Sequence, residues 1–162
     1  MTRPFLDTSV LLGGLIDLGP TVRPAQDVMA AVAEGRLRHP MTSWHCCLEF
    51  YAVATRLPEE FRLAPADAVR LLDAEILGRF EVGQLSKDRR LGLLRDAVED
   101  RVAGGRIYDA HIAEIARECG AKVVITDNVR HFSGLVRHGV RVATSSAFAA
   151  ELRSKSAGNR RL

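Results

Sequence analysis

Residues 108–127, YDAHIAEIARECGAKVVITD, join a helical pattern directly to a strand and indicate the fold of the whole chain. Apolar side chains return every three or four positions from Tyr108 to Cys119, as on one face of an amphipathic helix. Gly120 is typical of the residue that ends such a helix. The apolar run from Lys122 to Thr126 follows at once and predicts a buried strand. Helices that alternate with short apolar strands are typical of an α/β fold on a parallel sheet.

The same alternation extends in both directions and predicts an α/β fold with a central parallel sheet of about five strands flanked by helices. The expected strands are Arg3–Leu6, His39–Ser43, Phe80–Leu85, Lys122–Thr126 and Val140–Ala143. The expected helices are Ala25–Glu34, Glu49–Leu57, Ala64–Leu77, Lys87–Val102 and Tyr108–Cys119.

The length and composition predict one globular domain. The chain has 162 residues, of which 47% are apolar, and a chain of this size can bury a substantial core. We expect this domain to cover residues 1–150. Residues 151–162 contain Arg153 and Lys155 among Ser, Gly, Asn and further Arg, with too little apolar content to fold alone. We therefore expect a basic, disordered C-terminal tail, with contact to RNA as the less favoured role.

The cysteines and the apolar runs predict a cytoplasmic protein without membrane contact. Cys46, Cys47 and Cys119 are odd in number and two of them are adjacent, which suits neither a disulfide framework nor a CxxC zinc site. The first strand begins within three residues, and no apolar run approaches the roughly 20 residues that cross a membrane. The net charge of +3 suits a basic surface around a nucleic acid, but an ordinary solubility charge explains it equally well.

Four acidic residues stand beside strongly apolar sequence, namely Asp7, Glu49, Asp109 and Asp127. A buried charge is costly unless something pairs with it, and a divalent cation satisfies several carboxylates at once. Asp7 and Asp127 follow strands, whose carboxyl ends meet at one edge of a parallel sheet. Glu49 and Asp109 are expected to open helices that begin near this edge. The set predicts a metal site for Mg²⁺, with Mn²⁺ as a substitute.

Neighbouring residues have structural and functional interpretations that the sequence leaves open. Asp7 could form a local turn, and Asp109 could favour the start of its helix through the macrodipole. Thr8 and Ser9 suit either turn capping or a hydrogen bond to a carboxylate or phosphate. His111 lies in RIYDAHIAEIA and His131 in NVRHF. Isolated histidines are more often surface or packing residues, so both are left out of the catalytic set.

Two further groups of residues invite a nucleic-acid role. Arg89 and Arg90, in KDRR, are candidate phosphate contacts, although exposed charge runs usually only solvate a face. Trp44 and Tyr51 suit stacking on RNA bases. Because Trp44 stands beside two cysteines, we expect it to pack in the core instead.

Three stretches resemble the motifs of PIN-domain ribonucleases, specifically the VapC type, the toxin half of VapBC toxin/antitoxin pairs. FLDTSVLL resembles the first motif and maps to Asp7, Thr8 and Ser9. MTSWHCCLEFYAV resembles the second, a strand followed by a helix that bears Glu49. RIYDAHIAEIARECGAKVVITDNVRHF is similar to the third and fourth together and includes Asp109. The resemblance covers roughly residues 2–145.

One departure concerns the fourth acid. Many members of the family place it two positions after the strand-ending Thr126, where this chain has Asn128, whereas Asp127 follows Thr126 directly. Asp127 keeps the charge, and Asn128 can supply a carbonyl oxygen. Either residue therefore suits the fourth position of the site.

The resemblance implies a Mg²⁺-dependent endoribonuclease that cuts structured RNA such as transfer or ribosomal RNA. It also implies a VapB-type antitoxin partner and a homodimer formed through helices, with the apolar positions between Leu48 and Leu77 as candidate surface. Carboxylates around a divalent ion suit phosphodiester hydrolysis, because the ion activates water and neutralises charge on the phosphate. On this interpretation Asp7, Glu49, Asp109 and Asp127 are the catalytic and metal-binding residues.

Two other functions compete with this interpretation. A PIN-like module that binds RNA or protein without catalysis keeps the fold and loses the metal site. A phosphoryl-transfer enzyme or phospho-receiver domain would use Asp7 as the phosphorylated residue. Such sites generally place a second acid close to the first and a Lys at a later strand end, whereas Thr8 and Ser9 follow Asp7 here and Thr126 ends its strand.

Overall fold

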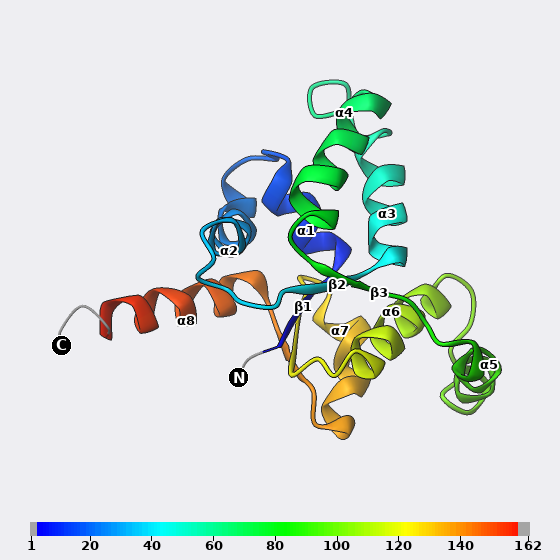
Figure 1. The fold of residues 1–162 in the computed structure, drawn as a ribbon. Helices are drawn as coiled ribbons and strands as arrows, with labels where there is room; N and C mark the ends of the chain where they lie inside the picture. The colour runs from blue at the N-terminus through cyan, green and yellow to red at the C-terminus, as the bar shows by residue number, and fades with distance from the viewer. Residues whose placement is uncertain (1–2, 159–162) are drawn as a thin grey trace.

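The computed structural model describes residues 3–158 and contains a five-stranded, entirely parallel sheet (Figure 1). The strands are β1 Pro4–Leu6, β2 Met41–Ser43, β3 Glu81–Gly83, β4 Val123–Ile125 and β5 Arg141–Ala143. Their order across the sheet is β3-β2-β1-β4-β5. All five expected strands are confirmed, each shorter than its predicted range.

Helices cover both faces of this sheet. The α-helices are α1 Thr8–Leu15, α2 Arg23–Ala33, α3 Trp44–Ala54, α4 Pro65–Leu71, α5 Arg90–Glu99, α6 Arg106–Glu118, α7 Val129–Phe132 and α8 Ser145–Gly158. Short 3-10 turns span η1 Pro20–Val22, η3 Lys87–Arg89 and η4 Ser133–His138, and a π-helical turn, η2 Leu72–Leu77, continues α4. Helices α1 to α4 lie on one side of the sheet and α6 and α7 on the other (Figure 1).

The strand order reverses beside β1, the central strand. The chain passes from β1 outward to β2 and β3, then returns to β4 on the opposite side of β1. All three residues of β1 are buried, and Phe5 pairs with Met41 of β2 and Val124 of β4. In open α/β sheets, ligands bind outside the carboxyl ends of the strands at such a reversal. This edge begins at Asp7, whose N–H donates to the Ile125 carbonyl at 3.0 Å.

Helix α1 was not expected, and two glycines explain why. Gly13 and Gly14 lower the intrinsic helix propensity of its sequence. Their missing side chains allow α1 to lie close to α2. A Cβ atom on Gly14 would stand 2.9 Å from the Ala25 carbonyl oxygen and also meet Met29. Packing against α2 therefore outweighs the unfavourable propensity, and it orients the helix that follows Asp7.

Helix α3 begins five residues earlier than expected. Ser43 caps it, because its hydroxyl accepts from the Cys46 N–H at 3.0 Å. Glu49 thus lies in the second turn of α3, and the expectation that it opens a helix is wrong. Trp44 also differs from the expectation. Cys46 and Cys47 are buried, but Trp44 is 44% exposed and does not pack in the core.

Helix α8 crosses the boundary expected at residue 150 and continues through Gly158. Disorder was expected over 151–162, whereas residues 151–158 are helical and 159–162 lie outside the described residues. Leu152 packs against the core, and Arg153 forms an ion pair with Asp27 of α2 at 2.8 Å. These tertiary contacts support a segment that is too polar to fold alone. Within residues 3–158, no helix is long and apolar enough to span a membrane.

Candidate active site

Asp7 stands at the carboxyl end of β1 and is almost completely buried. Its Oδ2 accepts hydrogen bonds from the Thr126 hydroxyl at 2.8 Å and the Ser9 hydroxyl at 3.1 Å. Burial raises the pKa of Asp7 above its ordinary value of 3.8, although these hydrogen bonds oppose the shift. The fold therefore holds a carboxyl group where its charged form lacks solvation.

Glu49 reaches the same edge of the sheet from α3. The Thr8 hydroxyl donates to its Oε2 at 2.6 Å, which joins Glu49 to the residue that follows Asp7. The Nε2 atom of His45 lies 3.4 Å from Oε1 of Glu49, one helical turn away. The Glu49 charge contributes to raising the pKa of both Asp7 and Asp109. One acidic residue therefore couples electrostatically to the other two.

Asp109 lies in the first turn of α6, as expected, and is half-buried. Nδ1 of His131, from α7, lies 3.0 Å from Oδ2 of Asp109. Burial raises the pKa of Asp109, the charge of His131 opposes this rise, and Glu49 adds to it. Asp109 thus shares its electrostatic environment with both acidic and basic neighbours.

The fourth acid, Asp127, has its carboxylate engaged elsewhere. Oδ1 accepts from the Ser145 N–H at 3.0 Å, and both carboxylate oxygens accept from the Ser145 hydroxyl, at 2.8 and 2.9 Å. Ser145 is the first residue of α8, so Asp127 satisfies a free N–H group of that helix. Its own N–H donates to Ser9 at 3.1 Å, and the N–H of Asn128 donates to Thr126 at 3.0 Å.

Glu49 therefore acts electrostatically on both Asp7 and Asp109 and is hydrogen-bonded to Thr8, the residue after Asp7, while the carboxylate of Asp127 binds the start of α8. The hydroxyls whose roles were open also have partners. Thr8 donates to Glu49 and Ser9 donates to Asp7, so both position acidic side chains. Each hydroxyl holds its carboxylate in one orientation.

Two histidines of the site were missed in the sequence. His131 was left out because it is isolated in the sequence, and only the fold brings α7 to Asp109. His45 precedes Glu49 by four residues, a helical spacing that could have indicated the contact. Its Nδ1 atom lies 3.0 Å from Nδ1 of His111, so one ring donates and the other accepts. Burial and the nearby His45 lower the pKa of His111.

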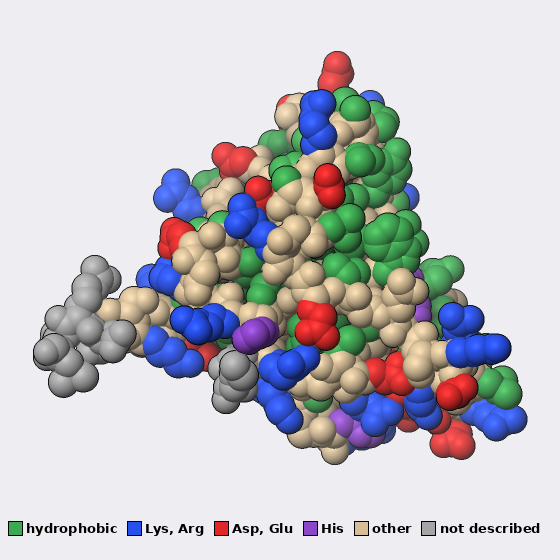
Figure 2. Space-filling view, in the orientation of Figure 1, with side chains coloured by type: hydrophobic (Ala, Val, Ile, Leu, Met, Phe, Trp, Pro, Cys, Tyr) green, Lys and Arg blue, Asp and Glu red, His purple; other side chains and the backbone are tan. Residues whose placement is uncertain are grey.

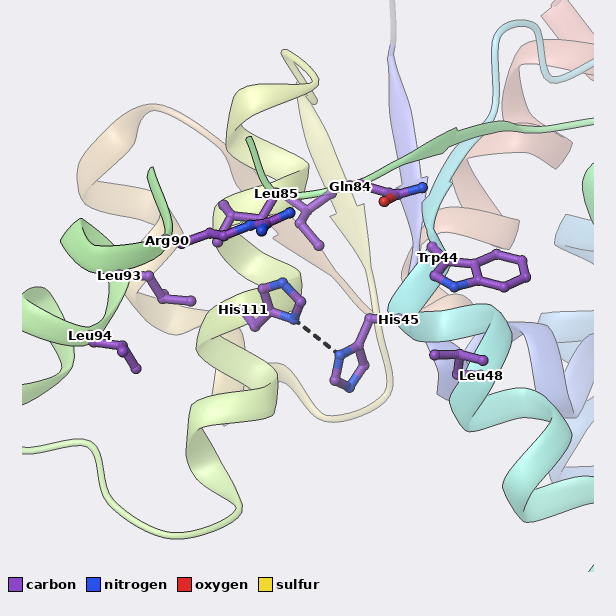
Figure 3. Close-up of a pocket in the computed structure, with 10 residues that line it drawn as sticks. Trp44, His45, Leu48, Gln84, Leu85, Arg90, Leu93, Leu94 and His111 are labelled. Carbon is purple, nitrogen blue, oxygen red and sulfur yellow. Dashed lines mark hydrogen bonds between the residues drawn. The ribbon is translucent and has the colours of Figure 1, made fainter. Parts of the chain in front are cut away.

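A groove of about 410 Å³ begins at this histidine pair. Figure 3 shows His45 and Trp44 of α3 on one side, His111 of α6 facing His45, and Leu93 and Leu94 of α5 on the far side. The segment that follows β3 closes the groove with Gln84 and Leu85, and Arg90 also lines it. Its walls are mostly apolar, with a few polar groups among them.

A second groove, of about 580 Å³, lies between α5, α6 and the segment 130–138. Its lining carries both charges, with Arg106 and Arg130 on the basic side and Asp96 and Asp100 on the acidic side, and it includes His131. Arg106 acts on Asp109 by lowering its pKa. The acidic site is therefore bordered on one side by an apolar groove and on the other by a charged one.

The side chains of the site are of the type that binds a hard divalent cation, but they are not spaced to hold one. Asp7, Glu49 and Asp109 offer carboxylate oxygens, which Mg²⁺ and Mn²⁺ prefer, and Mg²⁺ typically keeps several water ligands. Among residues 3–158, however, no three Asp, Glu, His or Cys side chains are placed to hold one ion as they stand. Glu49 contacts Thr8 and His45, and Asp109 contacts His131, so these side chains would have to leave their present partners to hold one ion together.

The family model described as PIN domain matches residues 3–130 of this chain, which includes Asp7, Glu49, Asp109 and both candidates for the fourth position. The chain belongs to the PIN-domain family. Within that family it is of the VapC type, and it is similar to Ribonuclease VapC27 of Mycobacterium tuberculosis (strain ATCC 25618 / H37Rv). The two are 36% identical over 123 residues, which cover 75% of this chain and 82% of that protein.

Solved structures share the fold at low sequence identity. PAE2754 from Pyrobaculum aerophilum aligns with a TM-score of 0.58 and 20% identity, over 94% of this chain and 98% of that one. VapBC-1 from nontypeable Haemophilus influenzae aligns with a TM-score of 0.58 and 18% identity, over 88% and 98% of the two chains. Mycobacterium tuberculosis VapC20, described as a Sarcin-Ricin loop cleaving toxin, also has a TM-score of 0.58, with 17% identity over 75% and 86%.

Proposed function

We propose that this chain is a Mg²⁺-dependent endoribonuclease, the toxin of a VapBC pair, and that it cleaves structured RNA such as transfer or ribosomal RNA. The observation that carries the proposal is the linked set of Asp7, Glu49 and Asp109 beside the strand reversal of a PIN-domain chain. Relatives named as ribonucleases support the activity, and the VapC20 description supports a structured RNA substrate.

In this proposal the three acids hold the ion directly or through water. When bound, the ion supplies activation of water and neutralises charge on the scissile phosphate. Thr126 and Ser9 keep the Asp7 carboxylate oriented, and Thr8 does the same for Glu49. Such second partners of metal ligands fix ligand orientation and raise affinity. Fixed carboxylates reduce the reorganisation that accompanies phosphodiester cleavage.

The fourth position remains part of the proposal, with Asp127 or Asn128 as its occupant. The hydrogen bonds of Asp127 to Ser145 favour Asn128, because a carboxylate that caps α8 is less available to an ion. Asn128 directly precedes α7, the helix that carries His131, and its N–H donates to the Thr126 hydroxyl that holds Asp7.

Cleavage of ribosomal and transfer RNA by the purified chain tests the activity. We expect Mg²⁺-dependent cleavage that EDTA stops. Asp7→Asn and Asp109→Asn should each lower the rate by more than about 100-fold, the most that loss of a residue hydrogen-bonded to a metal ligand typically costs. Asp73→Asn, an exposed acid on η2, is the control and should cleave normally. Undiminished cleavage in EDTA, or by Asp7→Asn, overturns the proposal.

We also propose a VapB-type antitoxin partner, a homodimer and a cytoplasmic location. The VapC type of this chain and its structural likeness to VapBC-1 from Haemophilus influenzae support the antitoxin partner. An antitoxin segment that carries a basic side chain into the acidic site would neutralise the carboxylates in place of metal.

A non-catalytic PIN-like module is the second candidate. Two observations favour this module over a phosphoryl-transfer enzyme or phospho-receiver domain. Among the described residues the acids are not grouped to hold one ion, and His45 and His131 contact two of them. The same cleavage assay separates the two candidates, because the module binds RNA or protein without metal-dependent turnover.

A further inference from the structure

The groove between α3, α5 and α6 lies outside the set of acids and has a composition of its own. Leu85, Leu93 and Leu94 make most of its walls apolar. Four groups with hydrogen-bonding or charged ends also line it, namely His45, His111, Gln84 and Arg90. Ligand pockets typically combine apolar walls with a few polar groups in this way, and the volume of about 410 Å³ falls in their usual range.

Aromatic side chains are exposed at this groove. Trp44 lines it and is 44% exposed, although a large indole is usually well buried. Tyr108, 56% exposed, packs its ring against His45 with 5.5 Å between centroids. An aromatic surface left open to solvent suits a flat ligand that can stack on it.

The groove and the acids share one residue. His45 lines the groove and contacts Oε1 of Glu49 with its Nε2 atom. When one phosphate of a polynucleotide lies at the acids, a neighbouring nucleotide is therefore expected to lie at the groove. Sequence-specific recognition of RNA commonly uses unpaired bases that stack on aromatic side chains and form hydrogen bonds through their edges.

Arg90 adds a cation at the groove that its neighbour cannot supply. Arg89 is engaged by two carboxylates, with Nε 2.8 Å from Glu114 and a terminal nitrogen 3.1 Å from Asp96. Arg90 instead faces the groove (Figure 3). Of the two arginines singled out in KDRR, one therefore holds α5 against α6 and the other is placed to meet a phosphate.

We infer that this groove is a base-binding subsite for single-stranded RNA, in which one unpaired base beside the cleaved bond stacks on Trp44. Gln84 and His111 present polar atoms to the base edge, and Arg90 contacts a flanking phosphate. The inference rests on the proposed ribonuclease function and adds to it the choice of an unpaired nucleotide at the cut. A purely apolar partner would cover the Gln84 amide and the Arg90 guanidinium without offering them hydrogen bonds.

Trp44 is the only tryptophan, so its fluorescence reports directly on the groove. The test uses the full chain with Asp7→Asn, Mg²⁺, and single-stranded RNA octamers of each base. We expect the octamers to quench Trp44 emission. Trp44→Ala should weaken binding, measured by fluorescence anisotropy of labelled octamers, by about 5- to 150-fold, which corresponds to one base–aromatic stack. Trp44→Phe should recover most of this loss.

Two matched pairs on α5 locate the contact. Leu94 lines the groove and is 54% exposed, whereas Leu91 is 58% exposed and lies outside the lining. Leu94→Ala should weaken binding and Leu91→Ala should not. Arg90→Ala should reduce the slope of log affinity against log salt by about one, whereas Arg95→Ala, on the same helix outside the lining, should not.

The outcomes separate this inference from the proposed function. If the wild-type chain cleaves RNA but octamers leave Trp44 emission unchanged, and Trp44→Ala neither weakens binding nor alters the cleavage pattern, the subsite is overturned while the nuclease stands. If Trp44→Ala loses binding to an antitoxin but keeps its affinity for RNA, the subsite is overturned as well. Trp44-dependent binding of octamers without any cleavage supports the subsite and counts against the nuclease.

Discussion

Asp7 carries a charge that its surroundings oppose. The residue is 4% exposed, and burial raises the pKa of its carboxyl group while the negative charge of Glu49 raises it further. Thr126 and Ser9 only partly compensate through their hydroxyls. A residue that costs stability and has polar neighbours aimed at it is a functional candidate by physical argument, since a packing role would be served better by a neutral side chain.

Asp7→Asn should therefore stabilise the fold at neutral pH without metal. Because the pKa of Asp7 is raised above 3.8 in the folded chain, the folded chain binds the proton more tightly than the unfolded chain. Stability therefore falls as the pH rises from 3.8 through the raised pKa. The variant removes that loss, about 1.4 kcal/mol per unit of pKa shift. Its Oδ1 can still accept from Thr126 and Ser9.

Urea unfolding in EDTA at about pH 4 and about pH 7 measures this effect. The advantage of Asp7→Asn over the wild type should be small at the lower pH and larger at the higher one. Asp73→Asn, at an exposed position, should show no such pH dependence. A constant or shrinking advantage would mean that the Asp7 charge is not what the fold opposes.

At the scale of elements, two side chains hold the first turn of α8: the Thr144 hydroxyl accepts from the Ala147 N–H at 3.1 Å, and the Asp127 carboxylate binds Ser145. The carboxylate accepts both the N–H and the hydroxyl of Ser145. Cap residues of this kind typically contribute about 1 kcal/mol. Capping of α8 thus explains the position of Asp127, the acid expected at the fourth site position. Its neighbour Asn128 directly precedes α7.

Alanine substitutions separate the two roles. Asp127→Ala and Ser145→Ala should each lower the free energy of unfolding by about 1 kcal/mol and reduce RNA cleavage by less than about threefold. Asn128→Ala should leave stability nearly unchanged and reduce cleavage by about tenfold or more. Loss of a residue that orients a metal ligand or its water typically has an effect of this size. If Asp127→Ala loses far more cleavage than Asn128→Ala, the carboxylate reaches the site and the capping explanation of its position fails.

The sequence predicted elements where local pattern and packing agree, and missed them where packing decides alone. The five strands are short apolar runs between turn residues, so their positions follow from composition. Helix α1 contains Gly13 and Gly14, and only close contact with α2 reveals why a helix forms there. The end of α8 is held by Leu152 and Arg153, whose partners are distant in sequence.

The same limit applies to the site. Three acids were predictable because each interrupts an apolar pattern that must be buried. The contact of Asp109 with His131 and the engagement of Asp127 by Ser145 depend on helix placement and have no local signature, whereas the four-residue spacing of His45 and Glu49 is a local one. The burial of Cys46 and Cys47 likewise did not predict the environment of Trp44, which begins α3 and is 44% exposed.

At the scale of the whole molecule, the proposed toxin function predicts growth arrest. Expression of the wild-type chain in a bacterial host should stop growth, because the proposed nuclease cuts RNA that translation needs. Asp109→Asn should abolish the effect, and Asp73→Asn should not. Optical density and intact ribosomal RNA after induction provide the measurement. Equal arrest by wild type and Asp109→Asn would show that toxicity is independent of the acids.

The flank formed by α3, α4 and η2 predicts where two copies meet. Figure 2 shows hydrophobic side chains gathered along this flank, and Tyr51, Val69 and Leu77 are exposed there. Monomers rarely expose such continuous apolar surface, and a stable interface buries about 1,200–2,000 Å² in total. This surface therefore suits the proposed homodimer.

Charges placed on this flank test the interface. Tyr51→Asp and Val69→Asp should weaken self-association by more than about tenfold, because each leaves an unpaired charge in an apolar contact. Val136→Asp, at an exposed apolar position on η4, is the control and should remain dimeric. Light scattering across micromolar concentrations gives the masses. A wild-type monomer excludes the dimer, and a dimer that tolerates both substitutions must use another face.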